Sequence, residues 1–134
     1  MKVLVIDDHA AMRQTIKCVL NAPGLLFIEG ADGKEAVRLF CAHQPDWVLM
    51  DLMLPEMDGI QATQAIRRHC HTARVIVVTN YNDANLREAA TSAGACGFVP
   101  KDNLCELRRF LTPPLASDGN GPSAPYPLLQ KKIP

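Results

Sequence analysis

Three aspartates follow apolar runs that lie far apart in the sequence. Asp7 and Asp8 come directly after the run VLVI, and Asp51 comes directly after the run WVLM. A carboxylate at the end of a buried segment loses hydration, so its burial is costly unless a positive charge or hydrogen-bond donors compensate it. Carboxylates that met in one place would also repel one another, and one of them would take up a proton. These residues therefore predict a site that contains positive charge.

A divalent cation would remove that repulsion. Mg²⁺ prefers oxygen ligands in octahedral geometry and keeps several waters, so we interpret Asp8 and Asp51 as direct ligands and Asp7 as a ligand through water. Thr79 follows the apolar run VIVV, and Lys101 follows GFVP. A hydroxyl, an ammonium group and Mg²⁺ around one free carboxylate oxygen suit a phosphoryl group. Asp51 is then the candidate nucleophile, which would become an acyl phosphate.

The apolar runs before these residues are expected to form strands. They are continuous rather than alternating, which is typical of parallel strands covered on both faces. Between them, apolar residues recur three or four positions apart, which predicts helices with one buried stripe. The predicted strands are 2–6, 25–30, 46–50, 74–78 and 96–99. The helical stripes are Met12, Ile16 and Val19; Val37, Phe40 and Cys41; Ile60, Thr63 and Ile66; Leu86, Ala89, Ala90 and Ala93; and Leu104, Leu107 and Leu111.

The alternation of strands and helices predicts an α/β fold with a doubly wound parallel sheet. The expected arrangement is flavodoxin-like, (βα)5, with strand order 2-1-3-4-5 and right-handed crossovers. Ligands of such sheets bind beyond the carboxyl ends of the strands. Because Asp7, Asp8, Asp51, Thr79 and Lys101 all follow predicted strands, we expect them to meet at that edge.

Composition limits the classes of function. Fourteen basic and fourteen acidic residues cancel, which argues against a general attraction to nucleic acid or to an anionic membrane. The first apolar run is too short for a signal peptide or a membrane span, so we expect a cytoplasmic protein without membrane contact. Scattered cysteines without a C-x-x-C pair predict reduced thiols, mostly packed as small hydrophobic residues. They are Cys18, Cys41, Cys70, Cys96 and Cys105.

The end of the chain differs from the rest. Residues 112–134 hold six of the ten prolines, together with a Ser-Asp-Gly-Asn-Gly segment. This composition blocks regular structure, so we divide the chain into one domain, 1–111, and a flexible or weakly docked Pro/Gly-rich tail, 112–134. The pair Lys131-Lys132 is too short a basic run for a nucleic-acid patch, and we expect no direct binding of nucleic acid.

The segments VLVIDD, WVLMDLMLPEMDG, VIVVT and GFVPK together resemble the receiver domain of response regulators in two-component signalling. The resemblance covers about residues 1–111 and is greatest to receivers attached to output domains of the LuxR/NarL type. We expect either a stand-alone receiver or a regulator that lost, or was cut from, its output domain. It implies that Asp51 takes a phosphoryl group from a sensor histidine kinase or a phosphotransfer protein. It also implies a phosphorelay switch rather than an enzyme, apart from self-phosphorylation and autodephosphorylation.

The resemblance assigns further roles. Asp7, Asp8 and Asp51 would hold Mg²⁺ together with the backbone carbonyl of Met53. Thr79 and Lys101 would contact the phosphoryl oxygens, and Phe98 would change rotamer with the state of Thr79, although Phe98 could also be a plain core aromatic. The fourth helix, fifth strand and fifth helix would form the partner-binding surface, and a homodimer through these helices is one expectation.

Several residues depart from the family pattern. Asn80 stands where receivers usually have a small residue, and we expect it to slow entry of the donor or alter the lifetime of the phosphate. Met53 and Tyr81 supply no carboxylate or amide to orient an attacking water, so we expect slow to moderate autodephosphorylation. Two alternatives stay open: a pseudo-receiver that acts by docking or dimerisation, and a Mg²⁺-dependent aspartyl-phosphate phosphohydrolase. The second is disfavoured because Met53 occupies the position of the general-acid aspartate.

Two histidine features have simpler interpretations. His9, directly after the acid pair, is interpreted as a first-turn helix residue rather than a ligand. His69-Cys70-His71 falls at the expected end of the third helix, where histidine suits the helix dipole. No second ligand pair with zinc-like spacing accompanies it, so a zinc site is not expected.

Overall fold

A parallel sheet forms the centre of the protein. The computed structural model describes residues 1–81 and 83–111, so the predicted tail at 112–134 lies outside the described residues. The strand order is β2-β1-β3-β4-β5, and every neighbouring pair is parallel. The predicted fold class and strand order are therefore confirmed. The strands are β1 Lys2–Ile6, β2 Leu26–Gly30, β3 Trp47–Asp51, β4 Val75–Thr79 and β5 Gly97–Pro100.

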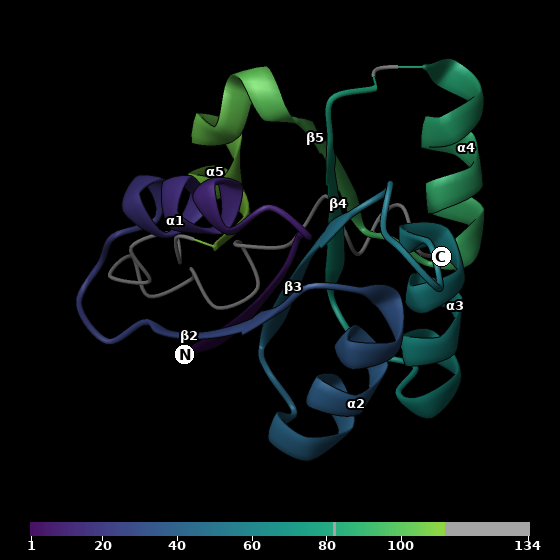
Figure 1. Ribbon diagram of the computed structural model, residues 1–134, viewed down its shortest axis with the longest axis horizontal. Coiled ribbons are helices and arrows are strands. Elements are labelled where there is room, and N and C mark those ends of the chain that lie inside the picture. The colour runs from purple at the N-terminus through teal and green to yellow at the C-terminus, as the bar shows by residue number, and fades with distance from the viewer. Residues whose placement is uncertain (82, 112–134) are drawn as a thin grey trace, which may run out of the picture.

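Helices cover both faces of the sheet (Figure 1), with α1 and α5 on one face and α2, α3 and α4 on the other. Aspartates begin three of these helices: Asp32, Asp58 and Asp83 each accept a backbone N–H of the first turn, as helix N-caps do. No helix in the described part of the chain is long and apolar enough to cross a membrane. The helices are α1 Ala10–Val19, α2 Gly33–His43, α3 Gly59–His69, α4 Ala84–Ala93, the 3₁₀ helix η1 Lys101–Glu106 and α5 Leu107–Leu111.

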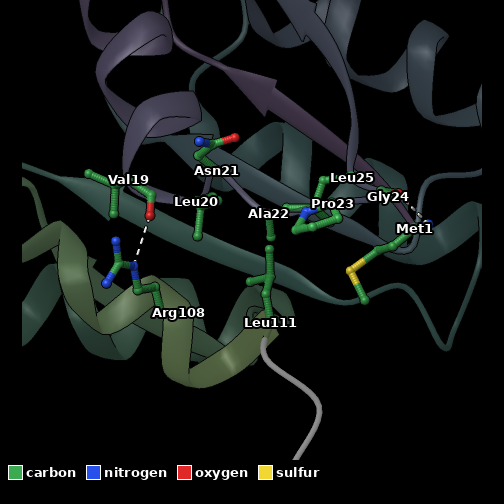
Figure 2. A pocket seen from close by; sticks show the side chains of 10 residues that line it. All are labelled: Met1, Val19, Leu20, Asn21, Ala22, Pro23, Gly24, Leu25, Arg108 and Leu111. Atoms are coloured by element: carbon green, nitrogen blue, oxygen red, sulfur yellow. Dashed lines mark hydrogen bonds between the residues drawn. The ribbon is translucent and has the colours of Figure 1, made fainter.

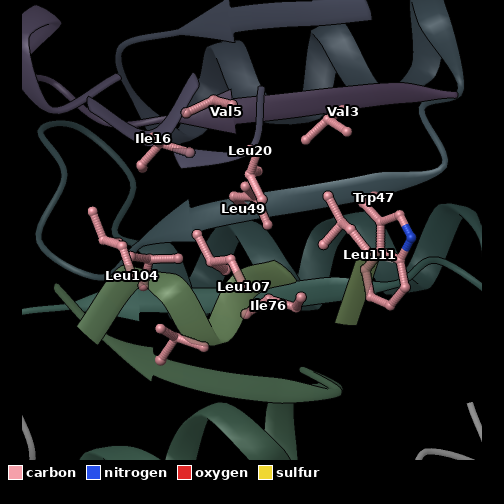
Figure 3. Close-up of a cluster of buried hydrophobic side chains, with 12 residues drawn as sticks. Val3, Val5, Ile16, Leu20, Trp47, Leu49, Ile76, Leu104, Leu107 and Leu111 are labelled. Atoms are coloured by element: carbon pink, nitrogen blue, oxygen red, sulfur yellow. The ribbon is translucent and has the colours of Figure 1, made fainter. Parts of the chain in front are cut away.

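The core has one layer on each face of the sheet. Val3 and Val5 of β1 pack toward α1 and α5, whereas Leu4 and Ile6 pack toward α2 and α3, because successive side chains of a strand point to opposite faces. Both layers are apolar, which explains why the strand sequences are continuous apolar runs. Figure 3 shows the first layer, in which Trp47 at the start of β3 lies near α5.

The ends of the elements differ from the predicted ones. Asp51 and Thr79 were expected just beyond their strands, but each is the last strand residue, because the backbone pairing continues to Asp51 opposite Val78 and to Thr79 opposite Pro100. The fifth helical stripe is also not one α-helix. Leu104 lies in η1, where Asn103 has non-helical angles of φ −140° and ψ 53°, and the α-helical part begins only after η1.

The expectation that most cysteines are buried is wrong. Cys18, Cys41 and Cys105 are exposed, whereas Cys70 and Cys96 are half-buried, and all five are free thiols. Cys41 was also placed in the buried stripe of the second helix. The residues of α2 that face the sheet are instead Ala36 and Phe40, and the neighbour of Phe40 points away because one residue turns a helix by about 100°.

Candidate functional site

The sheet brings four predicted site residues to its carboxyl edge. Asp7 directly follows β1, Asp51 ends β3, Thr79 ends β4 and Lys101 directly follows β5. Since all strands are parallel, their carboxyl ends lie on one edge, which is where doubly wound sheets bind ligands. These side chains are polar or charged and are nevertheless buried or nearly so.

Lys101 connects two of the carboxylates. Its Nζ lies 2.8 Å from Asp7 Oδ2 and 3.4 Å from Asp51 Oδ1. The Lys101 side chain is only 8% exposed and that of Asp7 only 1% exposed, so solvent screens these ion pairs much less than it screens surface pairs. The ammonium group therefore supplies the positive charge that the sequence predicted for this edge.

The environment shifts the proton affinities at this site. Burial raises the pKa of Asp51 above its usual range, the charge of Asp7 raises it further, and Lys101 opposes both effects. For Lys101, burial alone would lower the pKa, but the hydrogen bond and charge of Asp7 and the charge of Asp51 outweigh burial, and the pKa is raised. Lys101 is therefore a stable cation, and Asp51 is a carboxylate whose ionisation depends on nearby positive charge.

A group of ligand atoms that could hold a cation lies beside this pair. Among the described residues it comprises Asp7, Asp8 and His9, whose ligand atoms are all within 4.8 Å of one another. Asp51 does not belong to this group and is connected to Asp7 through Lys101. Two carboxylates from one loop and a third from the adjacent strand are the hard oxygen donors that Mg²⁺ prefers, so the residues fit that ion.

His9 lies closer to the acid pair than the sequence suggested. It is the N-cap residue of α1, directly before the first turn, and its side chain makes no cap hydrogen bond. Its Nδ1 lies 3.1 Å from Asp8 Oδ1 and 3.3 Å from Asp7 Oδ1, while its side chain is 72% exposed. The only signal in the sequence was its position next to the acid pair.

The Thr79 hydroxyl is held in place by the following loop. It is fully buried, and its Oγ1 accepts a hydrogen bond of 3.1 Å from the backbone N–H of Tyr81. A hydroxyl that accepts in this way can still donate its own hydrogen. Asn80 and Tyr81 themselves are exposed beside it. The cap of α4 is Asp83, which accepts from the backbone N–H of Asn85, so Thr79 does not serve as that cap.

The loop after Asp51 approaches the strand closely. The backbone N–H of Gly59 donates to the Leu52 carbonyl at 2.9 Å. A Cβ at Gly59 would lie 2.1 Å from the Asp51 carbonyl oxygen and 2.8 Å from Leu52 Cα. This contact explains why the motif has glycine there. A backbone hydrogen bond from Met53 also helps to keep the pKa of Asp51 from rising further.

Phe98, the predicted switch aromatic, is buried on the face of the sheet that α4 covers. It packs with Leu52, Val77 and Ala90. The Arg87 guanidinium of α4 lies 4.6 Å from the centre of the Phe98 ring, a distance at which a cation is attracted to a ring face. The Phe98 ring therefore points inward and lies under Arg87 of α4, one of the elements of the expected partner-binding surface.

A hollow of about 500 Å³ lies at the opposite end of the sheet. Figure 2 shows it between the end of α1, the segment before β2 and the end of α5, where Arg108 Nε donates to the Val19 carbonyl at 2.8 Å. Its lining is largely apolar and contains none of the predicted site residues. The residues that line it are Met1, Val19, Leu20, Asn21, Ala22, Pro23, Gly24, Leu25, Arg108 and Leu111.

Comparison with known proteins identifies relatives over most of this domain. The family model of the response regulator receiver domain matches residues 3–111. The transcriptional regulatory protein YdfI of Bacillus subtilis is 37% identical over 121 residues, which cover 89% of this chain and 56% of that protein. The chain spans about half the length of the first curated relatives it matches.

Solved structures agree in fold. A two-component response regulator of the LuxR family from Aurantimonas sp. SI85-9A1 superposes with a TM-score of 0.77 at 29% identity, covering 99% of this chain and 98% of that one. The CheX–CheY–BeF3–Mg²⁺ complex from Borrelia burgdorferi matches with a TM-score of 0.72 at 26% identity, covering 79% of this chain and 84% of that one.

Proposed function

Because the chain belongs to the response regulator receiver family, we propose that its Asp51 accepts a phosphoryl group and thereby switches a partner-binding surface of the domain. The observation that carries this proposal is the buried Asp51 carboxylate beside the Lys101 ammonium, at the carboxyl edge of the sheet. A carboxylate placed there has lost its hydration and faces a positive charge, which suits attack on a phosphorus atom.

The transfer itself needs little covalent chemistry from the protein. One carboxylate oxygen of Asp51 attacks phosphorus, the bond from phosphorus to the donor nitrogen breaks, and the imidazole of the donor histidine leaves with the electron pair and takes up a proton. Lys101 and the Thr79 hydroxyl would bind oxygens of the transferred group. This assignment is supported by the Lys101 ammonium beside Asp51 and by the Thr79 hydroxyl, which accepts a hydrogen bond and can still donate one. Positioning and charge stabilisation thus account for the reaction.

Mg²⁺, held by Asp7, Asp8 and Asp51 with the carbonyl of Met53, would neutralise charge on the transferred phosphoryl oxygens. This assignment is supported by the carboxylate group at the site and by a structural relative solved as a BeF3–Mg²⁺ complex. The chain's own part is to hold the carboxylates of Asp7 and Asp8 together, while Lys101 pairs with both Asp7 and Asp51 and offsets the repulsion between those two.

We further propose that the phosphoryl donor is a sensor histidine kinase or a phosphotransfer protein, and that the surface of α4, β5 and α5 carries the response, through a partner or a homodimer. A two-state mechanism is supported by Phe98 of β5, whose ring packs inward against Leu52, Val77 and Ala90 and lies under Arg87 of α4. A phosphoryl group that binds Thr79 and Lys101 would favour one of the two arrangements and shift the population toward it.

Intact mass spectrometry after incubation with acetyl phosphate and Mg²⁺ tests the central claim. The wild type should gain one phosphoryl group, and Asp51→Asn should gain none. Asp46→Asn is a matched control, since Asp46 lies at the other end of β3 and an asparagine can still accept the hydrogen bond from the Lys2 N–H.

Each other outcome contradicts the proposal. Absence of any Mg²⁺-dependent mass change in the wild type would favour a pseudo-receiver that works by docking alone. Repeated turnover of small phosphate esters would favour a phosphohydrolase. Phosphorylation that persists in Asp51→Asn would place the acceptor elsewhere.

A further inference from the structure

Arg13 makes two contacts that link its helix to the acid pair. It lies in the second turn of α1, and its side chain is only 19% exposed. Its Nη1 donates to the backbone carbonyl of Asp7 at 2.6 Å. Its Nε donates to Glu29 Oε1, on β2, at 2.8 Å. The guanidinium therefore bridges a carboxylate of the neighbouring strand and the carbonyl that joins the two site aspartates.

The other polar groups of Asp7 have partners as well. Its N–H donates to the Gly30 carbonyl at 3.1 Å, its Oδ1 accepts from the His9 N–H at 2.8 Å, and its Oδ2 pairs with Lys101. The bond from Arg13 fixes the remaining group, the carbonyl. The Asp7 carbonyl and the Asp8 N–H and Cα lie in one planar peptide unit. Fixing the carbonyl therefore also fixes the orientation of the Asp8 N–H and the position of the Asp8 Cα.

From these contacts we propose that Arg13, oriented by Glu29, is a positioning residue for the cation site of the acid pair. The proposal rests on the proposed function in that it presumes Mg²⁺ at Asp7 and Asp8. Without the guanidinium, the Asp7–Asp8 peptide could rotate and the two like charges could move apart.

Arginine suits this role better than lysine would. Its planar guanidinium presents N–H groups in fixed directions, so one donor can hold Glu29 while another holds the carbonyl. Glu29 is suited as the anchor, because Lys17 and Arg13 both donate to it and hold its pKa below its usual range. Glu29 thus stays ionised at neutral pH and keeps Arg13 in place.

Lys17 gives a matched control for the test. Its Nζ lies 2.6 Å from Glu29 Oε2, so Lys17→Met removes an ion pair of the same carboxylate. None of the hydrogen bonds or ion pairs described for Lys17 reaches the acid pair. If Arg13 acts only through stability, Arg13→Met and Lys17→Met should affect Mg²⁺ binding alike. If Arg13 positions the acid pair, only Arg13→Met should weaken Mg²⁺ binding.

The measurement is the rise in melting temperature with Mg²⁺ concentration, with no phosphodonor present, together with urea unfolding without Mg²⁺. We expect Arg13→Met to weaken Mg²⁺ binding about tenfold, as the loss of residues that orient metal ligands commonly does, and Lys17→Met to change it less than about twofold. Glu29→Gln, a milder change, should also weaken Mg²⁺ binding. It replaces Arg13→Met in the test if that variant is too unstable to titrate.

Equal Mg²⁺ affinity in wild type, Arg13→Met and Glu29→Gln would overturn the positioning role, and so would equal weakening in Arg13→Met and Lys17→Met. Either result leaves the proposed function intact if the wild type binds Mg²⁺ and is phosphorylated on Asp51. A wild type that binds no Mg²⁺ would overturn both proposals together.

Discussion

Replacing Gly59 by alanine should disturb the backbone of Asp51, the proposed phosphoacceptor. The added Cβ would lie 2.1 Å from the Asp51 carbonyl oxygen, whereas ordinary contacts begin at 3.4 Å. The three nearest atoms are all backbone atoms of Asp51 and Leu52, so no side-chain rotation relieves the overlap, and α3 must shift away from β3 by about 1 Å. Overpacking of this kind costs about 1–3 kcal/mol, and strain on the hydrogen bond from Gly59 to Leu52 adds about 1 kcal/mol.

One effect opposes this loss. Alanine is a better helix former than glycine by about 1 kcal/mol in a helix interior, and less at the first residue of α3. The expected net loss is therefore about 1–3 kcal/mol in the free energy of urea unfolding. Because misplacement of a reacting group by about 1 Å can cost 100-fold in rate, phosphorylation by acetyl phosphate should slow by at least about tenfold.

Gly30→Ala is the matched control for this change. The Cβ added at Gly30 would meet the ends of the Ile6 and Leu39 side chains rather than backbone, and these ends can move. We expect a smaller loss of stability and an unchanged rate of phosphorylation. If Gly59→Ala were as stable and as rapidly phosphorylated as the wild type, the close approach of α3 to β3 would be refuted.

Three further outcomes are expected. Burial and Asp7 raise the pKa of Asp51 above its ordinary value of 3.8, so the stability contributed by this group is full below pH 3.8 and is lost as the pH rises through the folded-state pKa. Asp51→Asn should therefore be more stable than the wild type at pH 7 without metal, and urea unfolding should show the difference vanish toward pH 3.8; a constant difference would contradict this. Burial raises the pKa of Cys96 to about 11, whereas a hydrogen bond with Thr72 lowers the pKa of Cys70. Iodoacetamide should therefore alkylate Cys70 much faster than Cys96, and equal rates by peptide mapping would argue against these environments. Met53 is exposed two residues after Asp51, the proposed phosphoacceptor, and offers no amide to orient water. The phosphoaspartate should therefore last longer than a few seconds, and Met53→Asn should shorten its lifetime, as measured by release of inorganic phosphate.

The fold could be predicted from the sequence because the strands of this sheet are buried on both faces. Their sequences are therefore continuous apolar runs that are easy to recognise. It misplaced the ends of β3 and β4 by one residue, since a polar side chain looked like the end of a strand. Backbone pairing does not depend on that polarity, and it carries Asp51 and Thr79 into the ladder. The fifth helix was misjudged for a similar reason: leucine spacing cannot distinguish a 3₁₀ turn followed by a short helix from one continuous helix.

The candidate site was predictable only in part. The meeting of Asp7, Asp51 and Lys101 follows from the parallel sheet, because each residue lies at the carboxyl end of its strand. The bridge from Arg13 to Glu29 was not foreseen. It joins residues sixteen positions apart on a helix and a strand, and no local spacing marks such a contact. The bend that brings His9 to the acid pair depends likewise on loop conformation rather than on residue type.

The placement of the site on separate strand ends has a consequence for the order of folding. Asp7 and Asp51 are synthesised well before Lys101, which directly follows β5, so we expect the lysine to lie beside them only in a chain whose β5 is paired with β4. A chain that emerges from the ribosome, or one cut before β5, carries the acids without the cation that offsets their repulsion. Contacts of such long sequence separation form late in folding. With the proposed function, only chains that have completed folding would therefore accept a phosphoryl group on Asp51, and chains without a docked β5 would not.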